Sequence, residues 1–169
     1  MIEKAAFGAA FVILETMKHQ IDFYTSYNQF YITDKDAGGA TNSDKFWTTE
    51  AFTERLAVED GILGVGVECY GPVKGEVYLL NSSNDTTILD EYDHIVEAGI
   101  EIKSGVIQIM DCPNSNVELE LRVEIGLYRV RIYSCNLASV DGDEGEDYYK
   151  IEIWPDAKME RKVLKQYSV

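Results

Sequence analysis

The fold is decided by the stretch Val117-Glu-Leu-Glu-Leu-Arg-Val-Glu-Ile125 and by its continuation after Gly126, Tyr128-Arg-Val-Arg-Ile-Tyr133. Side chains of a β-strand point alternately to its two faces, so apolar residues at every second position predict two half-buried strands. A glycine between two such runs is typical of a hairpin. We therefore expect these strands to pair, with their apolar residues facing the core. Arg129 and Arg131 should then face outward, across from the glutamates of the first strand.

Further short runs of strand character occur along the chain, separated by turn residues. Many short strands at this spacing predict an all-β fold, an antiparallel β-sandwich or barrel, and we favour the sandwich. No repeat or linker divides the chain, so we expect one domain over 1–169, with an N-terminal extension (1–19), a β-sandwich core (20–155) and a C-terminal tail or helix (156–169). The further runs are Asp22–Tyr24, Gln29–Thr33, Ile62–Cys69, Glu76–Leu80, Asp93–Val96, Ile100–Lys103, Val106–Met110 and Tyr148–Trp154.

One short helix is predicted from Thr48 or Thr49 to about Val58, as a cover for an open end of the sandwich. Thr48 suits an N-cap, and Trp47 and Phe52 stand at the positions of a hydrophobic staple. Gly61, just past this run, is a stop signal. A weaker pattern favours a second helix over Asp156–Lys165, after the strand that a proline ends.

The chain is strongly acidic, with 30 Asp and Glu against 15 Lys and Arg and a net charge of −15. Nucleic acid and anionic membranes would be repelled, so we expect neither direct nucleic-acid binding nor membrane insertion. A basic protein, a cation or no specific partner remain, because acidic surfaces also serve solubility. The apolar content of 46% is that of a globular protein with a core.

The cysteines and the first residues bear on location. Cys69, Cys112 and Cys135 are odd in number and lack a paired spacing, which predicts reduced thiols in a reducing compartment, the cytoplasm. The apolar stretch Ala5–Leu14 is too short to span a bilayer. We interpret it as a buried helix or strand, with an upstream-start extension and a secretion signal as alternatives; no small-x-small cleavage site follows it.

Acidic residues concentrate in two places. The run Asp141-Gly-Asp-Glu-Gly-Glu-Asp147 has five carboxylates in seven residues, directly before a strand, and Asp85–Glu101 has six acids and no Lys or Arg. If the fold brings these clusters together, they form a continuous negative face. The candidate partner-binding residues are Asp141, Asp143, Glu144, Glu146, Asp147 and Tyr148, with Asp90, Glu91 and Asp93 as a second group.

Catalytic and metal-binding patterns are weak. His19 and His94 lack metal-ligand spacing, and no Gly-x-Ser-x-Gly, phosphate-binding glycine loop or Cys-x-x-Cys is present. We therefore predict no enzyme, no catalytic residues, no metal and no cofactor. Calcium binding by the 141–147 run is an alternative, although Gly145 stands where an EF-hand needs its third ligand. A second alternative is that the run 141–147 is a solvated hairpin tip with no binding role.

Four blocks of the sequence resemble the bacterial competence protein J (ComJ) family, small acidic nuclease inhibitors. They are Ser26-Tyr27-Asn28-Gln29-Phe30, Trp47-Thr48, Gly126-Leu127-Tyr128-Arg129-Val130 and the long block from Asp141 to Pro155. The resemblance covers roughly 20–155 and implies a non-catalytic β-sandwich that binds and silences a partner endonuclease, as an inhibitor or immunity-type protein. In physical terms, carboxylates on a stiff face would imitate a DNA backbone. The alternative from the residues alone is a calcium- or ligand-binding β-sandwich module.

Overall fold

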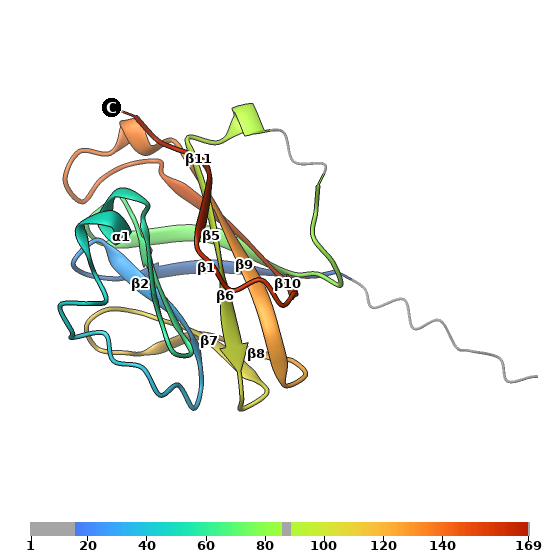
Figure 1. Ribbon diagram of the computed structural model, residues 1–169. Helices are drawn as coiled ribbons and strands as arrows, with labels where there is room; N and C mark the ends of the chain where they lie inside the picture. Colours follow the sequence, from blue (N-terminus) through green and yellow to red (C-terminus); the bar gives the residue numbers. More distant parts are fainter. Residues whose placement is uncertain (1–15, 86–88, 169) are drawn as a thin grey trace, which may run out of the picture.

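Two β-sheets pack face to face in the computed structural model, which describes residues 16–85 and 89–168 (Figure 1). The six-stranded sheet has the order β1-β5-β10-β9-β6-β11 and the five-stranded sheet the order β3-β4-β2-β7-β8. This confirms the predicted β-sandwich. The strands are β1 (Met17–Tyr24), β2 (Gln29–Asp34), β3 (Leu56–Glu59), β4 (Ile62–Gly66), β5 (Pro72–Leu79), β6 (His94–Ile102), β7 (Val106–Met110), β8 (Val117–Arg122), β9 (Gly126–Cys135), β10 (Tyr148–Pro155) and β11 (Lys162–Lys165); the helical elements are α1 (Thr49–Thr53) and the 3₁₀ turns η1 (Leu89–Glu91) and η2 (Leu137–Ser139).

Strand pairing is antiparallel except between β5 and β10, the second and third strands of the larger sheet, which run parallel. Strand β1 begins at Met17, inside the segment expected to be an extension, and pairs along its whole length with β5. The stretch Ala5–Leu14 lies outside the described residues. Within the described residues, no helix is long and apolar enough to cross a membrane.

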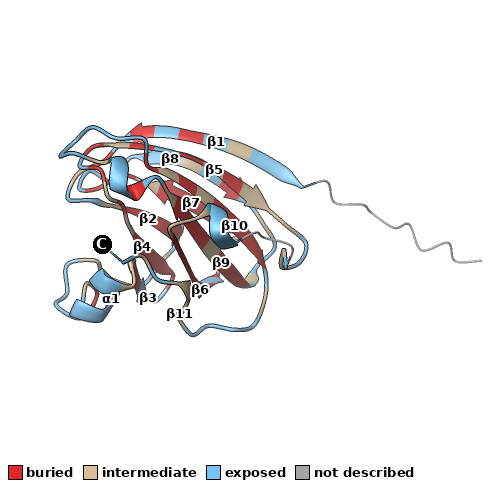
Figure 2. Cartoon of the chain, turned by 90° about the horizontal axis from the view of Figure 1, so that it is seen from above, coloured by how far each residue is buried: buried red, intermediate tan, exposed pale blue. Residues whose placement is uncertain are grey.

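The core lies between the two sheets, where the buried residues gather along β2, β4, β7 and β9 (Figure 2). Val130 and Ile132 of β9 are fully buried, as their alternation predicts, and Phe23 packs edge-to-face on Phe30 with ring centroids 5.7 Å apart. Burial of these apolar side chains is the main contribution to folding free energy.

The predicted β8–β9 hairpin is wrong, because the two strands belong to different sheets. Strand β8 is the edge of the smaller sheet beside β7, whereas β9 lies between β10 and β6 in the larger one. Gly126 does not adopt the positive φ that tight hairpin turns need, and residues 123–125 carry the chain across from sheet to sheet. The outward-facing arginines of β9 therefore cannot meet the glutamates of β8.

Arg129 and Arg131 instead share Glu97 of β6. Arg129 Nη2 lies 3.1 Å from Glu97 Oε1, and Arg131 Nε lies 2.6 Å from Glu97 Oε2. Arg129 is only 1% exposed, since the C-terminal segment covers it and accepts its hydrogen bonds through the carbonyls of Lys158 and Glu160, at 2.9 and 2.6 Å. The C-terminal segment thus buries part of the outer face of the larger sheet.

The second helix predicted over Asp156–Lys165 is also wrong. In a helix, the carbonyls of Lys158 and Glu160 would accept from main-chain N–H groups four residues later, but here they accept from Arg129. The segment then continues into β11, which pairs with β6. Gly99 permits this close crossing, because a Cβ there would overlap Met159.

Helix α1 forms where predicted but ends at Thr53. The Thr48 hydroxyl accepts a hydrogen bond from Ala51 N at 3.1 Å, and the Trp47 and Phe52 rings stack with centroids 5.0 Å apart, which confirms the cap and the staple. Arg55 then adopts a left-handed conformation (φ 58°) and the chain turns into β3. The stop signal assigned to Gly61 belongs instead to the turn between β3 and β4.

Candidate functional site

The acidic run 141–147 and the second group of candidate residues, Asp90, Glu91 and Asp93, lie at the same end of the larger sheet, whereas Glu97 and Glu101 lie further along β6. Strand β6 begins at His94 opposite Ser134, and β10 begins at Tyr148 opposite Cys135, so the segments that precede both strands leave the sheet together (Figure 1, upper end). Asp93 N donates to the Ser134 carbonyl at 2.8 Å, and Tyr148, the residue after Asp147, pairs with Cys135. Burial and the carboxylates of Asp93 and Asp147 raise the pKa of the Cys135 thiol. The two groups of candidate residues thus share one end of the sheet, but Glu97 and Glu101 do not belong to that end, and the continuous negative face stays a prediction.

Residues 141–147, here called the acidic loop, form a pinned turn. Asp141 and Glu144 exchange main-chain hydrogen bonds at 2.8 and 3.2 Å, around Gly142 at φ 67°. The Gly142 carbonyl accepts from Tyr70 N at 3.0 Å, and the Glu146 carbonyl accepts from Asn136 Nδ2 at 3.1 Å. These bonds hold the backbone while the side chains stay in solvent. The exposed carboxylates of the loop are Asp141, Asp143, Glu144 and Glu146.

Asp147 differs from its neighbours because it is only 7% exposed. Its Oδ2 accepts hydrogen bonds from the Tyr149 hydroxyl at 2.6 Å and from Cys69 N at 3.2 Å, and the same hydroxyl accepts from Glu68 N at 2.8 Å. Burial and the adjacent Asp147 carboxylate raise the pKa of Tyr149 well above its ordinary value. Asp147 thus anchors the acidic loop to the core.

Two other candidate residues also serve internal contacts. Asp93 is half-buried and accepts a hydrogen bond from Leu137 N at 2.9 Å, which ties η2 to the start of β6. The Tyr148 hydroxyl lies 3.3 Å from Gln20 Oε1, so this ring extends across the sheet toward β1. Of the predicted set, the exposed residues are Asp141, Asp143, Glu144, Glu146, Asp90 and Glu91.

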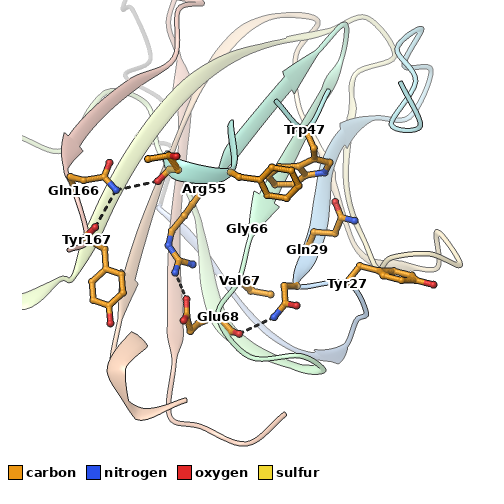
Figure 3. Close-up of a pocket in the computed structure, with 12 residues that line it drawn as sticks. Tyr27, Gln29, Trp47, Arg55, Gly66, Val67, Glu68, Gln166 and Tyr167 are labelled. Atoms are coloured by element: carbon orange, nitrogen blue, oxygen red, sulfur yellow. Dashed lines mark hydrogen bonds and ion pairs between the residues drawn. The ribbon is translucent and has the colours of Figure 1, made fainter. Parts of the chain in front are cut away.

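A pocket of about 560 Å³, which the sequence pattern did not single out, lies next to this acidic end (Figure 3). We call it the aromatic pocket; the residues used below are Tyr27, Gln29, Trp47, Phe52, Arg55, Glu68 and Tyr167. Tyr27 is 62% exposed and packs edge-to-face on Tyr70, with ring centroids 6.4 Å apart. Tyr70 N also donates to the Gly142 carbonyl of the acidic loop, so Tyr70 contacts both the loop and a residue of the pocket.

Backbone conformation around the aromatic pocket is unusual. Tyr27 (φ 60°) and Asn28 (φ 53°) form the tight turn between β1 and β2, where Ser26 and Gln29 are bridged. Two left-handed residues in succession are the type I′ hairpin geometry, which usually takes Asn-Gly. An exposed tyrosine in this conformation is rare and is held by Asn28, whose Nδ2 donates to the Glu68 carbonyl at 2.8 Å. In the sequence, the position of Ser26–Gln29 between two strand-like runs indicates this turn, but it does not indicate the pocket.

Two side-chain atoms in the lining are buried and unpartnered within the described part of the chain. They are Gln29 Oε1, an acceptor, and Trp47 Nε1, a donor. Buried polar atoms without partners cost free energy, so each calls for an explanation, such as strain, a bound water or a group of a binding partner.

Metal binding has no support in this part of the molecule. In residues 16–85 and 89–168, no group of three His, Cys, Asp or Glu side chains is arranged to hold a metal ion. The four exposed carboxylates of the acidic loop project from a turn whose backbone is held by protein contacts.

Comparison with known proteins gives the fold. Neither the protein-family models nor the curated protein sequences give a match. The chain does share a β-sandwich with two solved structures, over 83% of its own length and 98% of each of theirs. One is ComJ, the inhibitor of the DNA-degrading activity of NucA, from Bacillus subtilis, with a TM-score of 0.64 and 19% identity. The other is the product of crocagin biosynthetic gene J, with a TM-score of 0.54 and 18% identity. The chain therefore has the ComJ fold, and the resemblance seen in the sequence is confirmed as a likeness of fold.

Proposed function

We propose that this protein binds and inhibits a basic nuclease without catalysing a reaction itself. The observation that carries the proposal is the acidic loop, whose exposed carboxylates stand on a backbone pinned to the core through Asp147. Asp90 and Glu91 add negative charge at the same end of the sheet. The solved structure of ComJ, an inhibitor of the nuclease NucA, has the same fold.

The physical reason is competition with DNA. A nuclease binds the phosphate backbone through Lys and Arg side chains, and carboxylates at fixed positions can occupy the same surface. Attraction between opposite charges raises association rates by about 10- to 1000-fold at low salt. A loop already held by hydrogen bonds loses little conformational entropy on binding, so more of that attraction is retained.

The groups most suited to catalysis are occupied. His94 is fully buried, with Nε2 3.0 Å from the Glu54 carbonyl and Nδ1 accepting from Tyr167 N at 3.1 Å. Burial raises the pKa of Cys69 and Cys135, so both remain protonated thiols at neutral pH. All three cysteines are free, which supports a reducing compartment, and we propose that the protein acts in the cytoplasm.

The test is inhibition of DNA degradation by B. subtilis NucA, and by any basic nuclease encoded beside this gene. The variant Asp143→Lys/Glu144→Lys reverses two exposed charges of the acidic loop, and Asp36→Lys/Glu124→Lys makes the same change of net charge at the opposite end of the sandwich. We expect the loop variant to slow association by about tenfold or more at low salt, and the control to change it by less than about twofold. Absence of inhibition of both nucleases at micromolar protein and low salt would refute the proposal.

A further inference from the structure

We propose that the aromatic pocket receives an arginine side chain of the partner protein. The inference rests on the proposed function, because it takes the partner to be a basic nuclease. In this proposal, the acidic loop attracts the nuclease and the aromatic pocket binds one of its arginine side chains. The reasons are the shape of the walls, the unused hydrogen-bonding atoms and the charge nearby.

The walls offer flat aromatic surfaces. Figure 3 shows Trp47, Gln29 and Tyr27 along one side and Arg55, Gln166 and Tyr167 along the other. Phe52 stacks on Trp47 and is 65% exposed, so its ring presents a face to solvent. The Tyr27 ring, 62% exposed, points away from Arg55 and Glu68 and stands at the rim (Figure 3). A planar guanidinium stacks on such faces and is attracted to their π electrons.

Unused acceptors suit the same group. Gln29 Oε1 has no partner, and Glu68 uses only Oε2, which pairs with Arg55; its Oε1 has no hydrogen-bond partner within the described residues. A guanidinium carries five N–H donors in one plane, so it could donate to Glu68 Oε1 and, if the Gln29 side chain turned toward the pocket, to Gln29 Oε1 as well; a compact ammonium is less suited to two such acceptors. Trp47 Nε1 is buried as well, so it could donate to a main-chain carbonyl of the inserted segment only if the indole ring shifted.

Arg55 does not prevent this occupancy. Its guanidinium is held at the far wall, 5.6 Å from the centroid of the Tyr167 ring, with its charge paired to Glu68. The protein already places two arginines on one carboxylate, since Glu97 accepts from Arg129 and Arg131 through different oxygens. A second guanidinium at Glu68 would repeat that arrangement.

The surrounding charge favours a cation. Arg55 and Glu68 cancel within the pocket, so the local field is set by the acidic loop. The carboxylates of Asp147, Asp143 and Glu144 act on Cys69, the residue next to Glu68, and contribute with burial to its raised pKa. A positively charged side chain at the Glu68 end of the pocket would therefore be stabilised.

The first experiment uses N-acetyl-arginine amide as the probe and the side-chain N–H signals of the two tryptophans as reporters. Trp47 Nε1 lines the pocket, whereas Trp154 Nε1 donates to Asp156 at 3.3 Å outside it and serves as the internal control. We expect a titration of the Trp47 signal in ¹H–¹⁵N spectra with a Kd on the order of 1 mM, a weaker effect of N-acetyl-lysine amide, and no shift of Trp154. No shift of Trp47, equal shifts of both indoles, or equal affinity for the lysine probe would overturn the proposal.

The second experiment measures dissociation from NucA. Phe52→Ala removes a ring that is 65% exposed but stacks on Trp47, so it should lower the melting temperature slightly, whereas Gln29→Leu replaces an unpartnered amide and should not lower it; the melting temperature of each variant is measured alongside. We expect each to speed dissociation by about tenfold with little change in the association rate, whereas the control Ile125→Ala, 71% exposed at the opposite end, changes neither. Unchanged dissociation of both pocket variants would overturn the proposal. If the unmodified protein does not bind NucA, the proposed function loses its support, while the arginine titration still decides the pocket separately.

Discussion

Replacing Asp147 tests whether the acidic loop is held by the core. The carboxylate is 7% exposed and accepts hydrogen bonds from Tyr149 and from the main chain of Cys69, both fully buried. In Asp147→Ala, the Tyr149 hydroxyl and the Cys69 N–H would lose their acceptor in a region that water does not reach. A sequence count of charges would instead treat Asp147 as one more surface acid, equal to Asp143.

The magnitude follows from those two bonds. A hydrogen bond to a charged group contributes about 1.5–3 kcal/mol, so two contribute about 3–6 kcal/mol. Removing the carboxylate also removes its desolvation cost, which offsets part of the loss. We therefore expect Asp147→Ala to lower the free energy of unfolding by about 3 kcal/mol, and Asp147→Asn, which keeps one acceptor oxygen, by about half as much.

Urea denaturation measures these differences. Asp143→Ala is the matched control, because its side chain is exposed in the same loop, and it should change stability by less than about 0.5 kcal/mol. A double-mutant cycle with Tyr149→Phe should give a coupling energy of about 2 kcal/mol. If Asp147→Ala and Asp143→Ala were equally stable, the anchoring role would be wrong and the loop would have to be held by its other contacts.

Three further predictions concern the scaffold. Burial lowers the pKa of His94, so as the pH falls below about 6.5 the unfolded chain binds a proton at this residue before the folded protein does. The free energy of unfolding should then fall by at most about 1.4 kcal/mol per pH unit until the lowered pKa is reached. In His94→Gln, the urea midpoint should depend less on pH between about pH 7 and pH 5. Arg129→Met leaves Glu97 Oε1 and the carbonyls of Lys158 and Glu160 without their donor, while Arg131 still pairs with Glu97 Oε2. It should cost about 3 kcal/mol, with faster hydrogen exchange after residue 156; unchanged exchange would contradict this. Gly75→Ala would drive a Cβ into the main-chain oxygen of Tyr149 and should cost more than about 3 kcal/mol by the same assay, whereas Gly126→Ala, with open space around it, should be nearly neutral.

Local pattern was enough to place most strands. The strand predicted over Val106–Met110 is β7 with its observed bounds, and Val130 and Ile132 face the core as their spacing requires. Period-two alternation says which side chains share a face, but it is silent on which strand lies alongside. This is why the β8–β9 hairpin was predicted although the chain crosses between sheets at residues 123–125.

Where the sequence pattern was weak, hydrogen bonds between residues far apart in the chain determined the conformation of the segment. The residues after Pro155 have helix-compatible composition, but the carbonyls of Lys158 and Glu160 are taken by Arg129, about thirty residues earlier in the chain. Helix α1 ends early for a similar reason, because the chain must turn at Arg55 to begin β3. Tertiary contacts of this kind have no signature within a short window of sequence.

The aromatic pocket illustrates the same limit for the site. Tyr27 comes from the first turn, Trp47 and Phe52 from the region of α1, Glu68 from the β4–β5 connection and Tyr167 from the last residues of the chain. Each is ordinary in its own neighbourhood, and only the sandwich brings them together. The charged clusters could be found in advance because each is contiguous in sequence.

Net charge is a poor measure of what a partner would meet, because several acids are already used within the protein. Asp34 accepts from the main chain of Lys103 and Ser104, each at 3.1 Å, and Asp111 accepts from Asn116 N at 2.7 Å. Such carboxylates are held by internal donors and cannot reach a partner's lysines. Exposed acids at the far end of the sandwich act only through solvent, where attraction fades over a Debye length of about 8 Å at physiological salt. The total of −15 therefore matters less to recognition than the few exposed carboxylates at one end, and reversing two of them should slow association far more than the same change made elsewhere.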